Sequence, residues 1–226
     1  MKNKKMKQYL SIGIILLIIA IFGLFIYYKS YYSLEKVKEI ISQRKELSAN
    51  VQIIETYFDE NNKQIAYFDN YIKDNMCYIA QYDNNHKYAE SLIDVNNYCI
   101  SIVHDTKHII RTTSSEKITA LGEEEFFIKV NQNANYKYYG REEVNNHDCI
   151  KFSLCLQYSD NVELTYYYIN LEDNHIIKLE NYIGSSINDL SLKNSITYEY
   201  IYNSVVDTDI LKFDKNNYLD YQYDEL

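Results

Sequence analysis

The sequence predicts a mainly β protein of the α+β class, with flanking helices and one N-terminal transmembrane helix. Three features support this prediction. A long apolar run lies near the N-terminus, an amphipathic segment follows it, and apolar and polar residues then alternate with a period of two through much of the chain. The composition agrees, since 26 of the 226 residues are tyrosine, which like isoleucine favours strands.

The apolar run from Leu10 to Tyr28 contains no charged residue. In a helix, about 19 residues span roughly the 30 Å hydrocarbon core of a bilayer. Four lysines between Lys2 and Lys7 precede the run, and basic flanking residues are retained on the cytoplasmic side. A cleaved secretory signal peptide is the alternative, but this run is longer than a typical signal and ends in bulky side chains. The sequence therefore predicts attachment to the membrane through Leu10 to Tyr28.

The predicted organisation has four parts: a cytoplasmic basic tail (1–7), a transmembrane signal-anchor helix (8–29), an extracytoplasmic β-rich domain (30–214) and an acidic C-terminal tail (215–226). This describes a single-pass protein of the cell membrane whose N-terminus is cytoplasmic and whose C-terminal domain is extracytoplasmic. The C-terminal tail is expected to be loosely held.

The charge of the chain excludes one class of partner. The net charge is −9, and because five lysines and no acids lie before residue 30, the remainder of the chain carries −14. Such a surface repels phosphate backbones, so nucleic acid is not an expected partner. It also repels anionic lipid headgroups, so the membrane is expected to be reached through the apolar helix rather than through the domain surface.

Two helices are predicted outside the membrane segment. Apolar residues recur every three or four positions from Ser33 to Leu47, and Ser33 is placed to cap this helix. A second helix is predicted within Ser114 to Gln132, where the acids Glu123 to Glu125 suit the positive end of the helix dipole. A cation site is the alternative for these acids, but consecutive helical residues point to different faces.

Strands are predicted through most of the remaining chain. Pairs of asparagines separate several of them, and asparagine tolerates the left-handed conformation that tight hairpin turns need. Connections this short exclude parallel crossovers, so an antiparallel meander is expected. The segments of the first part are 51–59, 63–72, 76–83, 87–94, 97–104 and 107–113.

The clearest alternation lies between Asp148 and Ile183. A three-residue loop at 159–161 would make the apolar faces of the flanking strands coincide, whereas a two-residue loop would turn the second set outward. A two-residue loop at 173–174 would extend the same face to the next strand. The sequence then predicts one shared apolar face as a hypothetical ligand-binding surface, formed by Phe152, Leu154, Leu164, Tyr166, Tyr168 and Leu179.

Three stretches resemble one family of bacterial envelope proteins. They are YYGREEVNNHDCIKFSL from Tyr138, YYINLEDNHIIKLENY from Tyr167 and NSITYEYIYNSVVDTDILKFD from Asn194. Together with the order of helices and strands, they make residues 33–214 resemble the lipoprotein-carrier fold of the LolA, LolB and RseB type. The resemblance implies a curved antiparallel sheet or half-barrel with helices over its concave face, and a lipid or lipoprotein as ligand.

No catalytic or cofactor-binding motif is found, so the protein is predicted not to be an enzyme and to need no cofactor or metal. His104 and His108 have the spacing of a zinc pair on a helix, but they straddle a predicted hairpin. Cys149 follows His147 in the sequence, but a thiolate there would gain no helix dipole or neighbouring cation.

The cysteines are expected to be free thiols. Cys149 and Cys155 lie about 20 Å apart along one predicted strand, and Cys77 and Cys99 lie about 10 Å apart on either side of another. A disulfide needs Cα atoms within about 7 Å. Neither pair meets this condition, and a disulfide between the two sets of cysteines is the alternative.

Two functional classes are then open. The first is a membrane-tethered extracytoplasmic binding or sensing module, with an apolar concave face that accepts a lipid, an acyl chain or a partner peptide. The second is a structural or interaction protein of the cell envelope, with a self-filled core and no small ligand.

Overall fold

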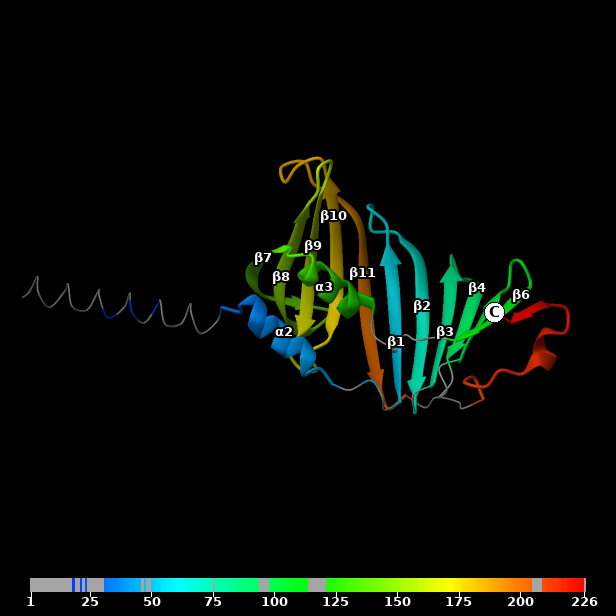
Figure 1. Ribbon diagram of the computed structural model, residues 1–226. Helices are drawn as coiled ribbons and strands as arrows, with labels where there is room; N and C mark the ends of the chain where they lie inside the picture. The colour runs from blue at the N-terminus through cyan, green and yellow to red at the C-terminus, as the bar shows by residue number, and fades with distance from the viewer. Residues whose placement is uncertain are drawn as a thin grey trace, which may run out of the picture. The chain divides into compact units, whose positions relative to one another are not determined.

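The computed structural model, shown in Figure 1, describes residues 31–45, 47, 50–74, 76–93, 98–113, 121–204 and 209–225, together with Ile18, Ile21 and Gly23. The predicted basic tail 1–7 and most of the predicted membrane segment Leu10 to Tyr28 lie outside these residues. Among the helices that are described, none is both long enough and apolar enough to span a bilayer.

The chain divides into two compact units, residues 1–38 and 39–226. Helix α2 (Leu34–Ser42) contains the boundary. The Lys36 backbone N–H donates to Ser33 Oγ at 3.3 Å, so the predicted cap at Ser33 is confirmed. The helix ends at Ser42 rather than at the predicted Leu47.

Six strands form the first half of the sheet, and each pairs antiparallel with the next. The predicted meander is therefore confirmed. Asn62, Asn84 and Asn85 lie at its turns with φ of 61°, 46° and 69°, the left-handed conformation expected of the asparagine pairs. The bounds are β1 Val51–Phe58, β2 Gln64–Lys73, β3 Met76–Asp83, β4 His86–Ile93, β5 Tyr98–Val103 and β6 His108–Thr113.

The second half begins with helix α3 (Leu121–Asn131), which falls within the predicted helical interruption. Strands β7 to β11 then pair antiparallel in sequence, and β11 pairs with β1. The result is one curved sheet in the order β12-β6-β5-β4-β3-β2-β1-β11-β10-β9-β8-β7 (Figure 1). The bounds are β7 Asn135–Val144, β8 His147–Gln157, β9 Val162–Asn170, β10 Ile176–Gly184 and β11 Ser191–Tyr202.

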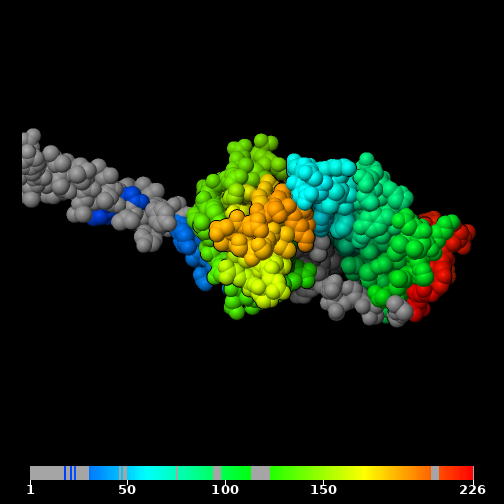
Figure 2. Space-filling view, turned by 90° about the horizontal axis from the view of Figure 1, so that it is seen from above, coloured from blue at the N-terminus to red at the C-terminus, as the bar shows by residue number. Residues whose placement is uncertain are grey.

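The C-terminal residues pack against the sheet. A 3-10 helix, η1 (Lys215–Tyr218), leads to β12 (Gln222–Glu225), which pairs in parallel with β6. Phe213, Tyr218 and Tyr221 pack on the buried cluster that β3 to β6 present on this face. Figure 2 shows the segment in red against the green strands. The expectation of a loosely held tail at 215–226 is therefore wrong, because its aromatic side chains cover apolar surface of the sheet.

The predicted alignment of β8 with β9 is also wrong. The Tyr158 backbone N–H donates to the Asn161 carbonyl at 2.8 Å, so the connection is a two-residue turn rather than a three-residue loop. Phe152 consequently lies opposite Tyr167.

The next connection differs as well. The Asn170 N–H donates to the His175 carbonyl at 2.9 Å, so the loop contains four residues rather than the predicted two. As a result, Leu179 lies opposite Tyr167 rather than Tyr168. Residues paired across neighbouring strands share a face. The six predicted residues are therefore divided: Phe152, Leu154 and Leu179 on one side of the sheet, and Leu164, Tyr166 and Tyr168 on the other.

Helix α3 covers the first of these sides, which we call the helix side of β8–β10. The Phe126 ring meets Phe152 and Tyr167 edge-to-face, with ring centroids 5.8 and 5.7 Å apart. All three side chains are 0% exposed, as are Leu154 and Leu179. Edge-to-face contact is the geometry that aromatic rings prefer. The helix side is thus filled by the protein's own side chains.

Candidate functional site

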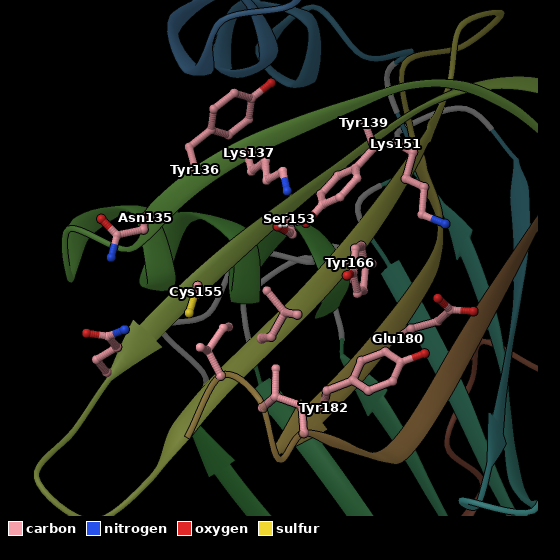
Figure 3. Close-up of a pocket in the computed structure, with 14 residues that line it drawn as sticks. Asn135, Tyr136, Lys137, Tyr139, Lys151, Ser153, Cys155, Tyr166, Glu180 and Tyr182 are labelled. Carbon is pink, nitrogen blue, oxygen red and sulfur yellow. Dashed lines mark hydrogen bonds between the residues drawn. The ribbon is translucent and has the colours of Figure 1, made fainter. Parts of the chain in front are cut away.

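The opposite side of the same strands carries an open hollow of about 810 Å³. We call this side the hollow side. Figure 3 shows side chains from β7, β8, β9 and β10 projecting into one space. The volume falls in the range of roughly 300–1,000 Å³ that is typical of small-molecule sites. Side chains that define it include Lys137, Tyr139, Lys151, Leu164, Tyr166 and Tyr182.

One end of the hollow is mostly apolar. Cys155 lies opposite Leu164, and Leu164 lies opposite Tyr182, so these three side chains form a row across the strands. Leu164 is 8% exposed. Asn135 of β7, opposite Cys155, continues the row with a polar side chain. The row therefore offers mainly apolar surface to a bound group.

The loop after β10 extends the apolar end by adding Ile187 and Leu190 to the lining. Gly184 allows this loop to fold back, since a Cβ on Gly184 would lie only 2.1 Å from the Asp189 carbonyl oxygen. A larger residue at Gly184 would push the loop away. The shape of this end therefore depends on a glycine at the end of β10.

The other end of the hollow is charged. Lys151 Nζ lies 3.0 Å from Glu142 Oε2 and stands over the Tyr166 and Tyr168 rings, 5.3 and 4.8 Å from their centroids. A cation over an aromatic ring is attracted by the negative face of the ring. Lys151 is therefore held in place at the floor of the hollow.

Glu180 also lies at this end, and its carboxylate already has an ion-pair partner and a hydrogen-bond donor. Lys178 Nζ lies 2.7 Å from its carboxylate, and the Tyr168 hydroxyl donates to it at 2.8 Å. Burial acts to raise the pKa of Glu180, but these bonds hold the pKa below its ordinary value. Glu180 is therefore a paired carboxylate.

The surroundings of Tyr139 favour negative charge. Burial acts to raise its pKa, but hydrogen bonds from Ser153 and Tyr166 and the nearby Lys137 ammonium lower the pKa below the ordinary value. Lys137 Nζ lies 4.9 Å from the centroid of the Tyr139 ring. The pKa of the neighbouring Tyr166 shifts in the opposite direction. Burial is the largest cause and the interaction with Tyr139 is the next, and together they raise this pKa to about 12. Of the two hydroxyls, Tyr139, which is nearer Lys137, therefore has the lower pKa.

Of the six residues that the sequence predicted as a ligand-binding face, Leu164 and Tyr166 line the hollow. Tyr168 lies beside them, buried. The three on the helix side face the core instead. Sequence analysis missed Lys137, Tyr139, Tyr182 and the 185–190 loop, because the predicted turn lengths aligned the core face of β8 with the hollow side of β9.

A separate buried carboxyl group, Glu55 on β1, accepts from Asn70 Nδ2 at 3.0 Å and from the Tyr57 hydroxyl at 3.3 Å. Glu55 is 4% exposed. Burial raises its pKa to about 7, and the two hydrogen bonds only partly offset this. Strongly perturbed carboxyl groups occur at functional sites and in structural networks.

Glu55 should make stability depend on pH. Because its pKa rises from 4.5 to about 7 on folding, its favourable effect is fully present below pH 4.5 and is lost as the pH rises through 7. We expect Glu55→Gln to stabilise the protein by about 2–3 kcal/mol at pH 8 and to change little at pH 4. Urea denaturation at both pH values measures this. Glu199→Gln, at an exposed position of β11, is the control, and identical pH profiles for wild type and Glu55→Gln would contradict the prediction.

Glu90 on β4 joins the C-terminal segment to the sheet. Its carboxylate accepts from the Tyr78 and Tyr218 hydroxyls at 2.5 and 2.6 Å and lies 3.0 Å from Lys87 Nζ and 3.2 Å from His104 Nε2. Burial acts to raise the pKa of Glu90, but the bonds from Tyr218, Tyr78 and Lys87 lower it below the ordinary value. The two tyrosine hydroxyls and Lys87 thus hold the Glu90 carboxylate between β3, β4 and the C-terminal segment.

A third buried carboxylate, Glu123, belongs to the acidic triplet at the start of α3. Its Oε1 lies 2.9 Å from His175 Nδ1, and Arg44 Nε lies 2.6 Å from Oε2. His175 Nε2 lies 2.9 Å from the Lys45 carbonyl oxygen. Across the described part of the chain, no group of three or more His, Cys, Asp and Glu side chains is placed to hold a metal ion.

All four cysteines are free. Cys77 and Cys99 both lie opposite Ile93 and are separated by its strand, as the sequence predicted. Burial raises the pKa of Cys77 to about 12 and that of Cys149 to about 11. Both thiols are thus held in the protonated, poorly nucleophilic form.

No protein-family model matches the chain, and no curated protein sequence matches it. Among solved structures, an uncharacterized conserved protein from Thermus thermophilus is similar, with a TM-score of 0.53 and 8% identity over 84% of this chain and 98% of that one. This likeness concerns the fold alone.

Two further structures are more distant. PNGF-II gives a TM-score of 0.38 with 8% identity over 79% of this chain and 31% of that one. A domain assigned as an outer membrane lipoprotein-sorting protein from Vibrio parahaemolyticus gives a TM-score of 0.32 with 7% identity over 81% of this chain and 97% of that one.

Proposed function

We propose that the protein is a membrane-tethered, extracytoplasmic binding module, not an enzyme, and that its ligand is a lipid or acyl chain seated in the hollow over β7–β10. The tether is the apolar run from Leu10 to Tyr28, and the half-barrel resemblance of the sequence is consistent with this role. The observation that carries the proposal is the hollow of about 810 Å³, which combines an apolar row with a charged end.

A structural role with a self-filled core is the second candidate. The aromatic packing of Phe126 against Phe152 and Tyr167 favours it for the helix side. It does not account for the hollow side, where Leu164, Ile187 and Leu190 face an open space. The two candidates therefore differ in whether a ligand occupies that space.

Photo-labelling with a neutral alkyl diazirine probe tests the proposal. The full chain is placed in nanodiscs, and the cross-linked peptides are identified by mass spectrometry. This mapping distinguishes probe bound in the hollow from probe bound to the apolar segment Leu10 to Tyr28. We expect labelling of β7–β10. Leu164→Gln should weaken this labelling about tenfold, since a buried leucine contributes roughly 1.5–3 kcal/mol.

The matched control is Ile65→Gln on β2, where isoleucine is 42% exposed and lies outside the hollow. It should leave the labelling of β7–β10 unchanged. Absence of labelling there in the wild type, or equal effects of the two substitutions, would reject the proposal.

A further inference from the structure

The charges around the hollow differ in sign from those of the chain as a whole. The chain carries −9. Among the described residues that line the hollow, the cations are Lys137 and Lys151, whereas Glu180 is the carboxylate. Glu180 is already paired with Lys178. A locally positive site in an acidic protein selects anions from solution.

Lys137 supplies the accessible part of this charge. Lys151 is paired with Glu142, whereas Lys137 lies beside Tyr139, a neutral side chain, with Nζ 4.9 Å from the ring centroid. Lys137 is also exposed at the rim, so its ammonium can turn toward a bound group. Burial acts to raise the pKa of Tyr139, but hydrogen bonds from Ser153 and Tyr166, together with Lys137, hold this pKa below its ordinary value, which agrees with an environment that stabilises negative charge.

The polar and apolar parts of the hollow are ordered along the strands. Leu164 belongs to the apolar row, Lys137 lies opposite Ser153 in the next row on this face, and Lys151 lies opposite Tyr168 in the row after that. At about 3.3 Å per residue, the rows of the two lysines lie about 7 and 13 Å from the apolar row. A ligand that contacts the apolar row and both lysines is elongated, with an apolar chain and a polar end.

We propose that the hollow binds a single-chain amphiphile with an anionic headgroup, either a carboxylate or a phosphate monoester. Its chain lies along Leu164, Tyr182 and the 185–190 loop, and its headgroup lies between Lys137 and Lys151. This inference rests on the proposed binding function and adds the chemistry of the ligand. The anion would accept charge-assisted hydrogen bonds, which are stronger than neutral ones.

The inference is tested by measuring how well unlabelled amphiphiles compete with the neutral diazirine probe for the hollow. The full chain is used, in zwitterionic nanodiscs. The competitors share one chain length and differ in headgroup: decanoate, decyl phosphate, decyl glucoside and decyltrimethylammonium, each below its critical micelle concentration. Empty nanodiscs correct for partitioning. We expect decanoate or decyl phosphate to compete at a concentration about tenfold lower than decyl glucoside, equivalent to about 1.4 kcal/mol. The better of the two identifies the headgroup.

Lys137→Gln should remove most of this advantage while leaving competition by decyl glucoside unchanged. The matched control is Arg141→Gln, on the same strand but opposite Ile150 and therefore on the helix side. It removes the same charge and should have no effect. Equal competition by all four headgroups, preference for the cation, or equal effects of the two substitutions would overturn the inference but leave the proposed function standing. Absence of label in the hollow would overturn both.

Discussion

Replacing Phe152 with alanine is expected to lower the free energy of unfolding by about 3–5 kcal/mol. The ring is 0% exposed, stacks on Tyr167 with centroids 5.2 Å apart and meets Phe126 at 5.8 Å. Removing the ring would leave a cavity between α3 and β9 that the neighbouring side chains cannot fill. Urea denaturation of the full chain, followed by circular dichroism, measures the loss.

Tyr139→Ala is the matched control for this substitution. Tyr139 is an aromatic residue of the neighbouring strand but is 42% exposed on the hollow side, so its loss should cost less than about 1 kcal/mol. A cost for Phe152→Ala no larger than that for Tyr139→Ala would mean that the helix side is not the core. In that case the roles of the two faces of β8–β10 would be reversed.

The β1–β6 meander could be predicted because local signals agreed there. The strands had a period of two, and several of the turns between them contained asparagines such as Asn84 and Asn85. The alignment of β8 with β9 could not be predicted in the same way. Both faces of these strands carry large apolar side chains, and Tyr167 on one face is as aromatic as Tyr166 and Tyr168 on the other. Hydrophobic alternation therefore did not distinguish a two-residue from a three-residue turn.

The hollow and the C-terminal segment depend on contacts between distant parts of the chain. The acids of the segment indicated a solvated tail, but Tyr218 reaches the buried Glu90 from 128 positions away. Similarly, the sequence indicates only that Gly184 ends a strand, whereas the structure shows that the loop at Asp189 folds back onto it. Such long-range approaches leave no periodic signal in the sequence. The residues that line the hollow could thus be predicted only where they fell on β9.

The acidic triplet at the start of α3 gives a second large expected effect. The Lys45 carbonyl can only accept, so His175 Nε2 is a donor. Nδ1 of the same ring lies 2.9 Å from Glu123 Oε1, and Arg44 Nε lies 2.6 Å from the other carboxylate oxygen. The His175 ring is 0% exposed and stacks on Tyr200 with ring centroids 4.2 Å apart.

Glu123→Ala is expected to destabilise the protein by about 3–5 kcal/mol, because it leaves both the buried His175 ring and the Arg44 guanidinium without their partner. Glu123→Gln should cost less, since its side-chain amide can still form a hydrogen bond to His175. Glu124→Ala changes the adjacent, exposed member of the triplet and should cost less than about 0.5 kcal/mol. Urea denaturation gives the three free energies of unfolding. Equal costs for Glu123→Ala and Glu124→Ala would show that the contact between Glu123 and His175 does not hold α3 to the β9–β10 hairpin.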